Sequence, residues 1–305
     1  SPGEIVTCVV DLAMIHDSGG PRRVKPILDK LKVGVWDASK IVLVSDHYAP
    51  CVDAESAAIL KLTREWAEEH GIKNFYDQQG ICHVVTPERG HLHPGMFAVG
   101  GDSHSPTGGA FGAYMFGIGA TDMAGVLATG KTWIRVPHTI SINWTGAMGV
   151  GVAAKDMALK MCAVLGMDGG DYQAIQYTGE AVKSLDMMER MTLCNMAAEL
   201  GAQTGIIEPD EVTTHYLVEA GVVPGEWQIF ESDAEAEYLR VHEFNGDTLE
   251  PQVAAPNSPS NTSNVSDADK VDIDQFYIGA CTGAKLSDLK MVASVLKGNK
   301  VASGK

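Results

Sequence analysis

The chain has 305 residues, of which 45% are hydrophobic and 20% charged, a composition typical of soluble globular proteins. This length is sufficient for two domains, or for one large α/β domain with insertions, around a sizeable core. The formal net charge of −16 argues against nucleic-acid binding, because proteins that contact the phosphate backbone carry clustered Lys and Arg.

The sequence contains no run approaching the roughly 18 apolar residues of a membrane-spanning helix, and its first residues lack the layout of a signal peptide. We therefore expect no membrane partner and a cytoplasmic location. The cysteines lie among apolar neighbours without a CxxC pair, so we expect reduced, mostly buried thiols. They are Cys8, Cys51, Cys82, Cys162, Cys194 and Cys281.

The first two predicted strands span residues 4–10 and 40–45, and the second leads directly into Asp46 and His47. An acid next to an imidazole at the end of a strand is a candidate site. From residue 52 to residue 70, apolar side chains recur at helical spacing, and Gly71 supplies a stop.

Residues 81–85 are predicted to form a further strand, which carries His83 within an apolar run. A lone histidine in such a run is more often a hydrogen-bonded core residue than a catalyst. The apolar run 96–99 predicts a buried strand, and Asp102, Ser103 and His104 follow it inside a glycine-rich stretch. Open α/β sheets bind ligands at the carboxyl ends of strands, although these residues also suit a turn with local side-chain bonds.

Residues 110–129 are rich in Gly and Ala and predict one or two tightly packed helices. Within and after them, residues 125–132 match the P-loop pattern GxxxxGKT. A P-loop follows a strand and opens a helix, whereas here the expected order is helix then strand. A P-loop NTPase is therefore kept only as a minor alternative.

Residues 139–144 predict a strand, and residues 153–164 predict a helix that ends before Gly166. Residues 189–200 are strongly helical and place Asn195 and Glu199 four residues apart, on one face. Such a face is often simply solvated, but the apolar neighbours indicate a buried helix, where a carboxylate is costly without a partner.

Residues 249–269 are rich in Pro, Asn, Ser and Thr, which predicts a linker or surface loop. Residues 276–283 then predict a strand that runs into Cys281, and residues 286–296 predict a helix. A thiol near a helix start is favoured as a thiolate, whether as a nucleophile or as a metal ligand, although an inert buried cysteine is equally compatible with the position.

These strand ends together carry paired acids and imidazoles, the groups that transfer protons, beside a cysteine that suggests a metal. Such a set suits a lyase that adds or removes water. The segments that carry it are GDSHSPTGGAFG from residue 101, SDH from 45, GICH from 80, MTLCNMAAELGA from 191 and IGACTG from 278. In this order they resemble the aconitase superfamily, and most closely the large subunit of its two-subunit branch, the 3-isopropylmalate dehydratase and homoaconitase type.

The resemblance covers nearly the whole chain and implies an α/β fold with aconitase-like three-layer α/β/α domains around a [4Fe–4S] cluster. Three cysteine thiolates hold such a cluster and leave one iron open as a Lewis acid for the substrate. We expect residues 1–250 to form an N-terminal α/β region, residues 251–270 a mobile linker or surface loop, and residues 271–305 the start of a further α/β domain.

The resemblance also implies individual roles. Cys281 is the first cluster ligand, and His47, oriented by Asp46, protonates the departing hydroxyl. Asp102 pairs with His83, and Glu199 holds His104. Three further residues line the substrate site: Ser103, which contacts the substrate, Asn195, which orients water or hydroxyl at the iron, and His16, where the match is looser.

The sequence departs from the family pattern in several places. The family's other two cluster cysteines form a downstream CxxC, and the arginines that bind substrate carboxylates also lie beyond the end of this chain. Ala280 and Gly283 replace the usual Ser and Asn beside Cys281. In the two-subunit branch the serine base belongs to a small, swivelling-domain partner subunit. Because both ends look cut, we expect a C-terminally incomplete chain.

The leading hypothesis is therefore the large subunit of a hydro-lyase that isomerises a 2-hydroxy di- or tricarboxylic acid, an anionic substrate, through an unsaturated intermediate. The alternative is an inactive apo scaffold or binding fragment that lacks the cluster. Cluster reconstitution discriminates between the two hypotheses.

Overall fold

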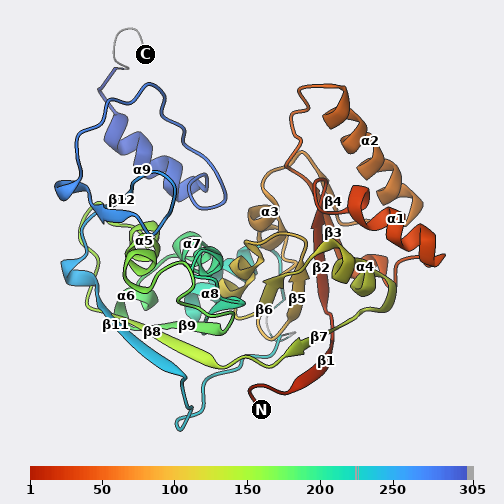
Figure 1. Ribbon diagram of the computed structural model, residues 1–305, viewed down its shortest axis with the longest axis horizontal. Coiled ribbons are helices and arrows are strands. Elements are labelled where there is room, and N and C mark those ends of the chain that lie inside the picture. Colours follow the sequence, from red (N-terminus) through yellow and green to blue (C-terminus); the bar gives the residue numbers. More distant parts are fainter. Residues whose placement is uncertain (224, 226, 301–305) are drawn as a thin grey trace.

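The computed structural model describes residues 1–300 except residues 224 and 226. Two parallel β-sheets with associated helices occupy opposite halves of the molecule, so the α/β class is confirmed (Figure 1). The first sheet has the strand order β4-β3-β2-β5-β6, and all its neighbouring strands are parallel. Its strands are β2 (Leu12–His16), β3 (Ile41–Ser45), β4 (Phe75–Asp77), β5 (Phe97–Gly100) and β6 (Tyr114–Gly117).

Both faces of the first sheet are buried, as is usual for parallel sheets. Along β2, Ala13 and Ile15 join one core, while Met14 joins the other. Helices α1, α2 and α4 contribute to the first core and α3 to the second, so this half has the expected three layers. These helices are α1 (Pro21–Leu31), α2 (Ala54–Glu69), α3 (Cys82–Glu88) and α4 (Ala120–Thr129).

The strand order of the first sheet creates a topological switch point. The chain proceeds from β2 through β3 to β4 on one side, and then returns to place β5 and β6 on the other side of β2. The connections that follow β2 and β5 therefore diverge and leave a crevice at the carboxyl ends of these strands, which is where ligands bind in open α/β sheets.

The second sheet has the strand order β10-β9-β8-β11, again with parallel neighbours. One of its faces, which includes Ile140, Trp144 and Tyr177, joins the same core as Met14, so an apolar core connects the two halves. Its strands and helices are β8 (Thr139–Thr145), β9 (Ala174–Thr178), β10 (Thr204–Ile207), β11 (Arg240–Asn245), α5 (Ala154–Leu165), α6 (Glu180–Lys183), α7 (Met187–Asn195) and α8 (Glu211–Glu219).

The opposite face of the second sheet is polar. Gln176 lies on this face and donates hydrogen bonds to Glu208 at 2.8 Å and to Ser232 at 2.7 Å. Tyr238 donates a further bond to the Gln176 side-chain oxygen at 2.7 Å. The segment before β11 therefore covers part of this face through hydrogen bonds between side chains.

The 3₁₀ helix η2 (Ser105–Phe111) joins the two halves, and all seven of its residues are buried. It packs against β6 of the first sheet and against α7 and β10 of the second. A Cβ at Gly109 would overlap the carbonyl oxygen of Gly205 in β10, so only glycine permits this approach. The glycine-rich stretch singled out in the sequence is thus the seam of the fold.

The remaining elements lie at the periphery. Strands β1 and β7 form an antiparallel ribbon, and β12 and β13 form a small hairpin that packs on α5. Their bounds, with those of the other short helices and α9, are β1 (Ile5–Val9), β7 (Lys131–Arg135), β12 (Gln252–Ala254), β13 (Thr262–Asn264), η1 (Ala38–Lys40), η3 (Met196–Ala198), η4 (Gly246–Thr248), η5 (Val265–Asp267) and α9 (Leu286–Leu296). Among the described residues, no helix combines the length and apolar character needed to cross a bilayer.

The hairpin β12–β13 lies within residues 251–270, where the sequence predicts a linker or surface loop. The division of the chain at residues 250 and 270 stays a prediction. The context of residues 125–132 agrees with the sequence interpretation, because α4 precedes Gly130 and β7 follows it, the reverse of a P-loop.

Two strand predictions were wrong, and several strands, among them β2 and β6, were not predicted. Residues 82–88 form α3 instead of a strand, because a short apolar run does not distinguish a buried strand from a buried helical turn. Residues 276–283 form no strand, and Phe276 is exposed there without a neighbouring ladder. Within the predicted helical region 110–129, residues 114–117 form β6, since β5 offers them a parallel partner.

The seam predicts a clear difference between two glycine substitutions. Gly109→Ala should destabilise the protein by about 1–3 kcal/mol or more, the usual cost of overpacking, because the added Cβ meets backbone atoms of the facing strand. Gly125→Ala lies inside α4, and its Cβ meets nothing within 4 Å, so it should stabilise the protein by up to about 1 kcal/mol. Urea unfolding of both variants measures the difference, and equal stability of the two would contradict the proposed seam.

Candidate active site

The carboxyl ends of three neighbouring strands deliver the polar groups of the site. β2 ends at His16 and is followed by Asp17, while β3 is followed by Asp46 and His47. β5 ends at Gly100, two residues before Asp102. Because β3, β2 and β5 are adjacent and parallel, these side chains meet at the switch point of the sheet.

Asp102 lies at the centre of the site. Its Oδ1 accepts a hydrogen bond from His83 Nε2 at 2.7 Å and another from the backbone N–H of His104 at 2.8 Å. Its Oδ2 lies 3.7 Å from His47 Nε2. Burial acts to raise the pKa of Asp102, but hydrogen bonds from the histidines outweigh it and hold the pKa well below its usual value. Asp102 is therefore a carboxylate at neutral pH.

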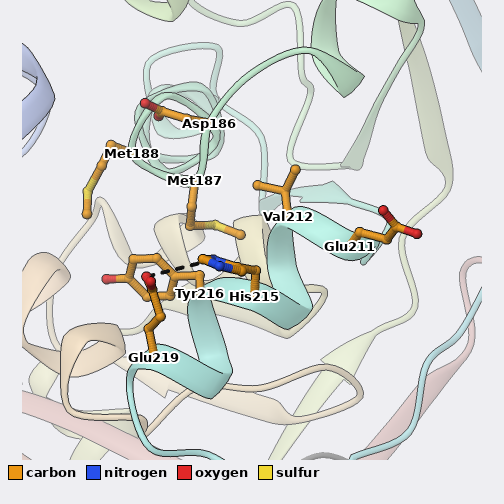
Figure 2. A pocket seen from close by; sticks show the side chains of 8 residues that line it. All are labelled: Asp186, Met187, Met188, Glu211, Val212, His215, Tyr216 and Glu219. Carbon is orange, nitrogen blue, oxygen red and sulfur yellow. Dashed lines mark ion pairs between the residues drawn. The ribbon is translucent and has the colours of Figure 1, made fainter.

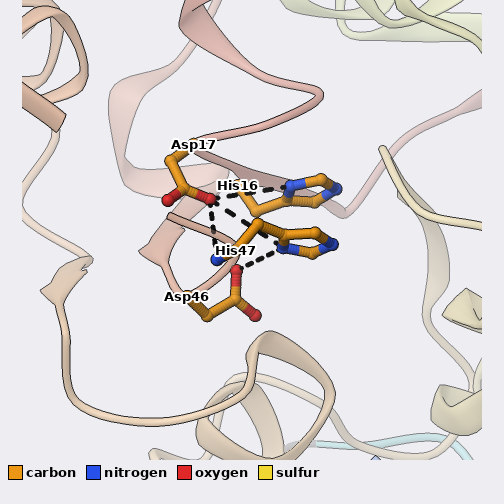
Figure 3. A group of neighbouring side chains, drawn as sticks. All are labelled: His16, Asp17, Asp46 and His47. Atoms are coloured by element: carbon orange, nitrogen blue, oxygen red, sulfur yellow. Dashed lines mark hydrogen bonds and ion pairs between the residues drawn. The ribbon is translucent and has the colours of Figure 1, made fainter. Parts of the chain in front are cut away.

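Asp46 and His47 form a second imidazole–carboxylate pair, shown in Figure 3. His47 Nδ1 donates to Asp46 Oδ1 at 2.7 Å, and the backbone N–H of Cys82 donates to Asp46 Oδ2 at 2.6 Å. The carboxylates of Asp102 and Asp46 raise the pKa of His47 from 6.5 to about 10, against the opposing effect of burial. His47 is therefore an imidazolium at neutral pH and can donate a proton.

His16 stacks on His47, with ring centroids 3.9 Å apart and planes 12° from parallel (Figure 3). Its Nε2 donates to the carbonyl of Gly101 at 3.1 Å, and its Nδ1 accepts from the N–H of Gly19 at 3.3 Å. These two bonds fit the neutral ring. Burial, with the charge of His47, lowers the pKa of His16, so the pair consists of one neutral and one charged imidazole.

The sequence interpretation missed Asp17, which is fully buried beneath this pair. Its carboxylate accepts from the backbone N–H groups of His47 at 3.1 Å and Tyr48 at 2.9 Å. The ligand atoms of His16, Asp17, Asp46 and His47 lie within 4.8 Å of one another, close enough to hold a metal ion. Since both oxygens of Asp17 are already engaged, we assign it the role of shaping the His47 turn.

His104 links the two halves of the molecule. Its Nε2 donates to Glu199 Oε1 at 3.1 Å, across the seam formed by η2. Hydrogen bonding with Asp102 raises the pKa of His104, burial opposes this, and Glu199 adds to the rise. Ser103 is exposed beside this ring, with its Oγ 3.4 Å from His104 Nδ1. A hydroxyl in that position is available to a bound molecule.

Cys281 reaches the same site through Asn195. The fully buried Asn195 donates to Thr107 Oγ1 at 2.8 Å, and Thr107 donates to the carbonyl of His104 at 2.6 Å. The thiol of Cys281 lies 3.7 Å from Asn195 Oδ1. Asp102 is close enough to Cys281 to influence its ionisation. A thiol and the acid–imidazole pairs therefore border one site.

The donor chemistry of Cys281 fits one position of a metal–thiolate group. Burial raises the pKa of its thiol, and the hydrogen bond with Asn195 opposes this rise. A bound cation would therefore stabilise the thiolate. Within residues 1–300, the other cysteines are not in this position: Cys82, Cys162 and Cys194 are buried in the cores, and Cys8 and Cys51 lie elsewhere on the chain.

The contacts above connect every residue expected at the site, with Thr107 as a bridge that the sequence interpretation missed. The expected pairs His83–Asp102 and His104–Glu199 are both present. One detail differs, because α7 ends at Asn195 and continues as the tighter helix η3, so Asn195 and Glu199 do not share one α-helical face. The tighter turn lets Asn195 point at Thr107 while Glu199 meets His104.

A separate hollow of about 430 Å³ lies between α8 and the start of α7, and Figure 2 shows its lining. Met187, Tyr216 and the ion pair of His215 with Glu219 at 3.8 Å form part of its wall. None of the residues expected at the site lines this hollow. The residues expected at the site therefore lie outside this hollow.

Comparisons with known proteins agree on one family. A family model described as "Aconitase family (aconitate hydratase)" matches residues 6–305. The 3-isopropylmalate dehydratase large subunit 1 of Methanopyrus kandleri is 46% identical over 300 residues, which are 98% of this chain and 71% of that protein. The "Probable methanogen homoaconitase large subunit" of Methanothermobacter thermautotrophicus is 43% identical, over 99% of this chain and 71% of that protein.

Among solved structures, the holo form of aconitase X from Thermococcus kodakaraensis matches with a TM-score of 0.45 and 12% identity. The match covers 80% of this chain and 58% of that one. This likeness is too low to carry any conclusion about the site.

The geometry predicts that His47 stays protonated well above neutral pH. Its ring nitrogens should show the imidazolium signature in NMR up to about pH 9, because its pKa lies near 10. Asp46→Asn removes one of the two carboxylates and should move the titration toward 6.5. Since the folded pKa exceeds the ordinary 6.5, the stabilisation is complete below that pH and is lost as the pH rises toward 10. A His47 ring that titrates near 6.5 in the unsubstituted protein would contradict this assignment.

Proposed function

This chain belongs to the aconitase family, and we propose that it is the large subunit of a hydro-lyase acting on a 2-hydroxy di- or tricarboxylic acid such as 3-isopropylmalate. The reaction removes water to give an unsaturated acid and adds it back. The observation that carries the proposal is the junction of Cys281 with the acid–imidazole pairs through Asn195 and Thr107.

Membership of this family implies an iron–sulfur cluster, and we propose that Cys281 is one of its thiolate ligands. When bound, a [4Fe–4S] cluster supplies a Lewis-acidic iron that polarises the substrate hydroxyl and carboxylate. The position of Cys281 beside Asn195, on the second half of the molecule, supports this role. Of the six cysteines, Cys281 is the one proposed as a ligand.

His47 is proposed as the acid that protonates the departing hydroxyl. Its Nδ1 proton is held by Asp46, and its Nε2, which lies 3.7 Å from Asp102 Oδ2, carries the proton proposed for transfer. After transfer the neutral ring remains oriented by Asp46 and by its stack on His16. In the rehydration step the same nitrogen takes a proton back from water, as microscopic reversibility requires.

Asp102 and Glu199 are proposed to orient their histidines. His83 donates to Asp102, which fixes one ring nitrogen as a donor and turns the other away from it. Glu199 binds His104 from the opposite half of the molecule, so the position of this pair depends on the packing at the seam. We propose that Ser103, Asn195 and His16 contact the substrate or its hydroxyl, supported by their places around these pairs.

The partner is proposed to be a small, swivelling-domain subunit that supplies the serine base and part of the carboxylate site. The similar proteins are named as large subunits, and this supports a two-subunit enzyme. The six cysteines are unpaired, which fits a reducing compartment, and we propose the cytoplasm. We also propose that residues 1–250 form an N-terminal aconitase-like α/β region and that residues 271–305 begin a further α/β domain.

Cluster reconstitution tests the proposed function. The full chain, assembled with the small subunit, is loaded with iron and sulfide and mixed with an unsaturated diacid. We expect visible absorption from the cluster and loss of the ultraviolet absorption of the double bond as water is added. A folded complex that binds no iron, or that binds it and hydrates none of the diacids tested, would support the inactive-scaffold alternative instead.

A histidine substitution tests the role of the central pairs. His104→Ala should lower kcat about 10²–10⁴-fold, the usual effect of losing an acid–base group, while the unfolding midpoint stays close to that of the unsubstituted protein. His215→Ala is the matched control, because that ring is exposed on α8 and lies outside the site. Loss of stability with unchanged turnover would instead identify His104 as a structural histidine.

A further inference from the structure

The turn that carries Cys281 is held by a buried lysine. The side chain of Lys285 is fully buried, and its Nζ donates to Thr192 Oγ1 on α7 at 2.7 Å and to the carbonyl of Cys281 at 3.3 Å. It also pairs with Asp288 at 3.1 Å. Lys285 thus ties the backbone of Cys281 to α7, one helical turn before Asn195.

A second lysine approaches the same turn from α5. Lys155 Nζ donates to Thr282 Oγ1 at 3.2 Å and lies 3.3 Å from the sulfur of Met196. Both partners are neutral atoms, whereas Lys285 has the carboxylate of Asp288. Burial lowers the pKa of Lys155, which reflects the cost of holding a buried ammonium group whose hydrogen-bond partners among the described residues are neutral.

We propose that Lys155 and Lys285 are positioning residues that seat Cys281 and supply the positive charge for an anionic metal–thiolate group bound there. The inference rests on the proposed function, because it takes an iron–sulfur cluster as that group. It assigns a role to two residues that the sequence interpretation did not select and that contact none of the acid–imidazole pairs by hydrogen bonds in the described part of the chain.

The two lysines divide this task. Lys285 fixes the geometry of the turn. Lys285 contacts Thr192 and Cys281 contacts Asn195, so the turn is held to α7 at two positions that are three residues apart. Lys155 supplies charge, since its ammonium group donates to the hydroxyl of Thr282, the residue that follows Cys281, at 3.2 Å. In a poorly solvated site such a charge interacts strongly with an anion.

A charge at Lys155 should affect the redox equilibrium of the cluster. Reduction adds an electron and so a negative charge, which a nearby cation stabilises. Replacing Lys155 by Gln or Met should therefore favour the oxidised cluster about tenfold, a fall of 59 mV in the potential of a one-electron couple. Lys155→Arg keeps the charge and should restore the potential.

The experiment compares cluster loading and potential in the full chain assembled with its small subunit. We expect Lys285→Met to lower the iron bound per chain at least twofold and to speed amide hydrogen exchange in residues 279–285 of the metal-free protein. Lys155→Gln should bind iron normally but shift the potential. The controls are Lys160→Met on α5, the helix of Lys155, and Lys290→Met on α9, the helix that Lys285 caps; each removes the same charge.

The outcomes separate this inference from the proposed function. If the unsubstituted protein binds no cluster, the proposed function fails. If it binds the cluster, and the Lys155 and Lys285 variants match the unsubstituted protein in iron content, potential and exchange, the inference is overturned and the proposed function stands. Equal shifts in the control variants would also overturn it, because they would show a general effect of charge.

Discussion

The contact of Gly109 with Gly205 is the constraint on which the site depends. Only residues without a Cβ allow η2 to approach β10 so closely, and that approach joins the two halves of the molecule. The first half carries Asp102 and His104 directly before η2, and the second carries Glu199 just before β10. The distance at which the backbones meet therefore sets the distance at which His104 and Glu199 meet. The geometry of the proposed proton-transfer groups therefore depends on the packing at the seam.

The site contains positively charged groups, whereas the chain as a whole carries a net negative charge. A net charge of −16 would repel an anionic substrate at long range, but salt screens that repulsion beyond roughly 10 Å. Nearby, the imidazolium of His47 and the ammonium groups of Lys155 and Lys285 supply positive charge. His47 is proposed to transfer a proton, whereas the two lysines are proposed to hold the turn of Cys281 and to supply charge. The proposed roles thus combine anion binding with proton transfer.

The sequence predicted local features well and long-range contacts poorly. The strand ends at Asp46 and Asp102 follow from short apolar runs, whose signal is contained in a few residues. Asp17 was missed because β2, the strand that carries it, was not recognised, and the short run around His83 suits a strand or a helix equally. Motif resemblance supplied the pairs His83–Asp102 and His104–Glu199, which spacing alone does not imply. Lys155 escaped notice because its partner, Thr282, lies 127 residues further along the chain.

The end of α7 explains why one short segment serves several tasks. Thr192 accepts the bond that holds the Cys281 turn, Asn195 joins that turn to η2, and Glu199 holds His104. An uninterrupted α-helix would place Asn195 and Glu199 on one face, one turn apart. The change to the tighter helix η3 after Asn195 turns the two side chains toward different partners. Because residues of this helix end hold both the turn of Cys281 and the ring of His104, the proposed metal ligand and the proposed acid–base pair share one support.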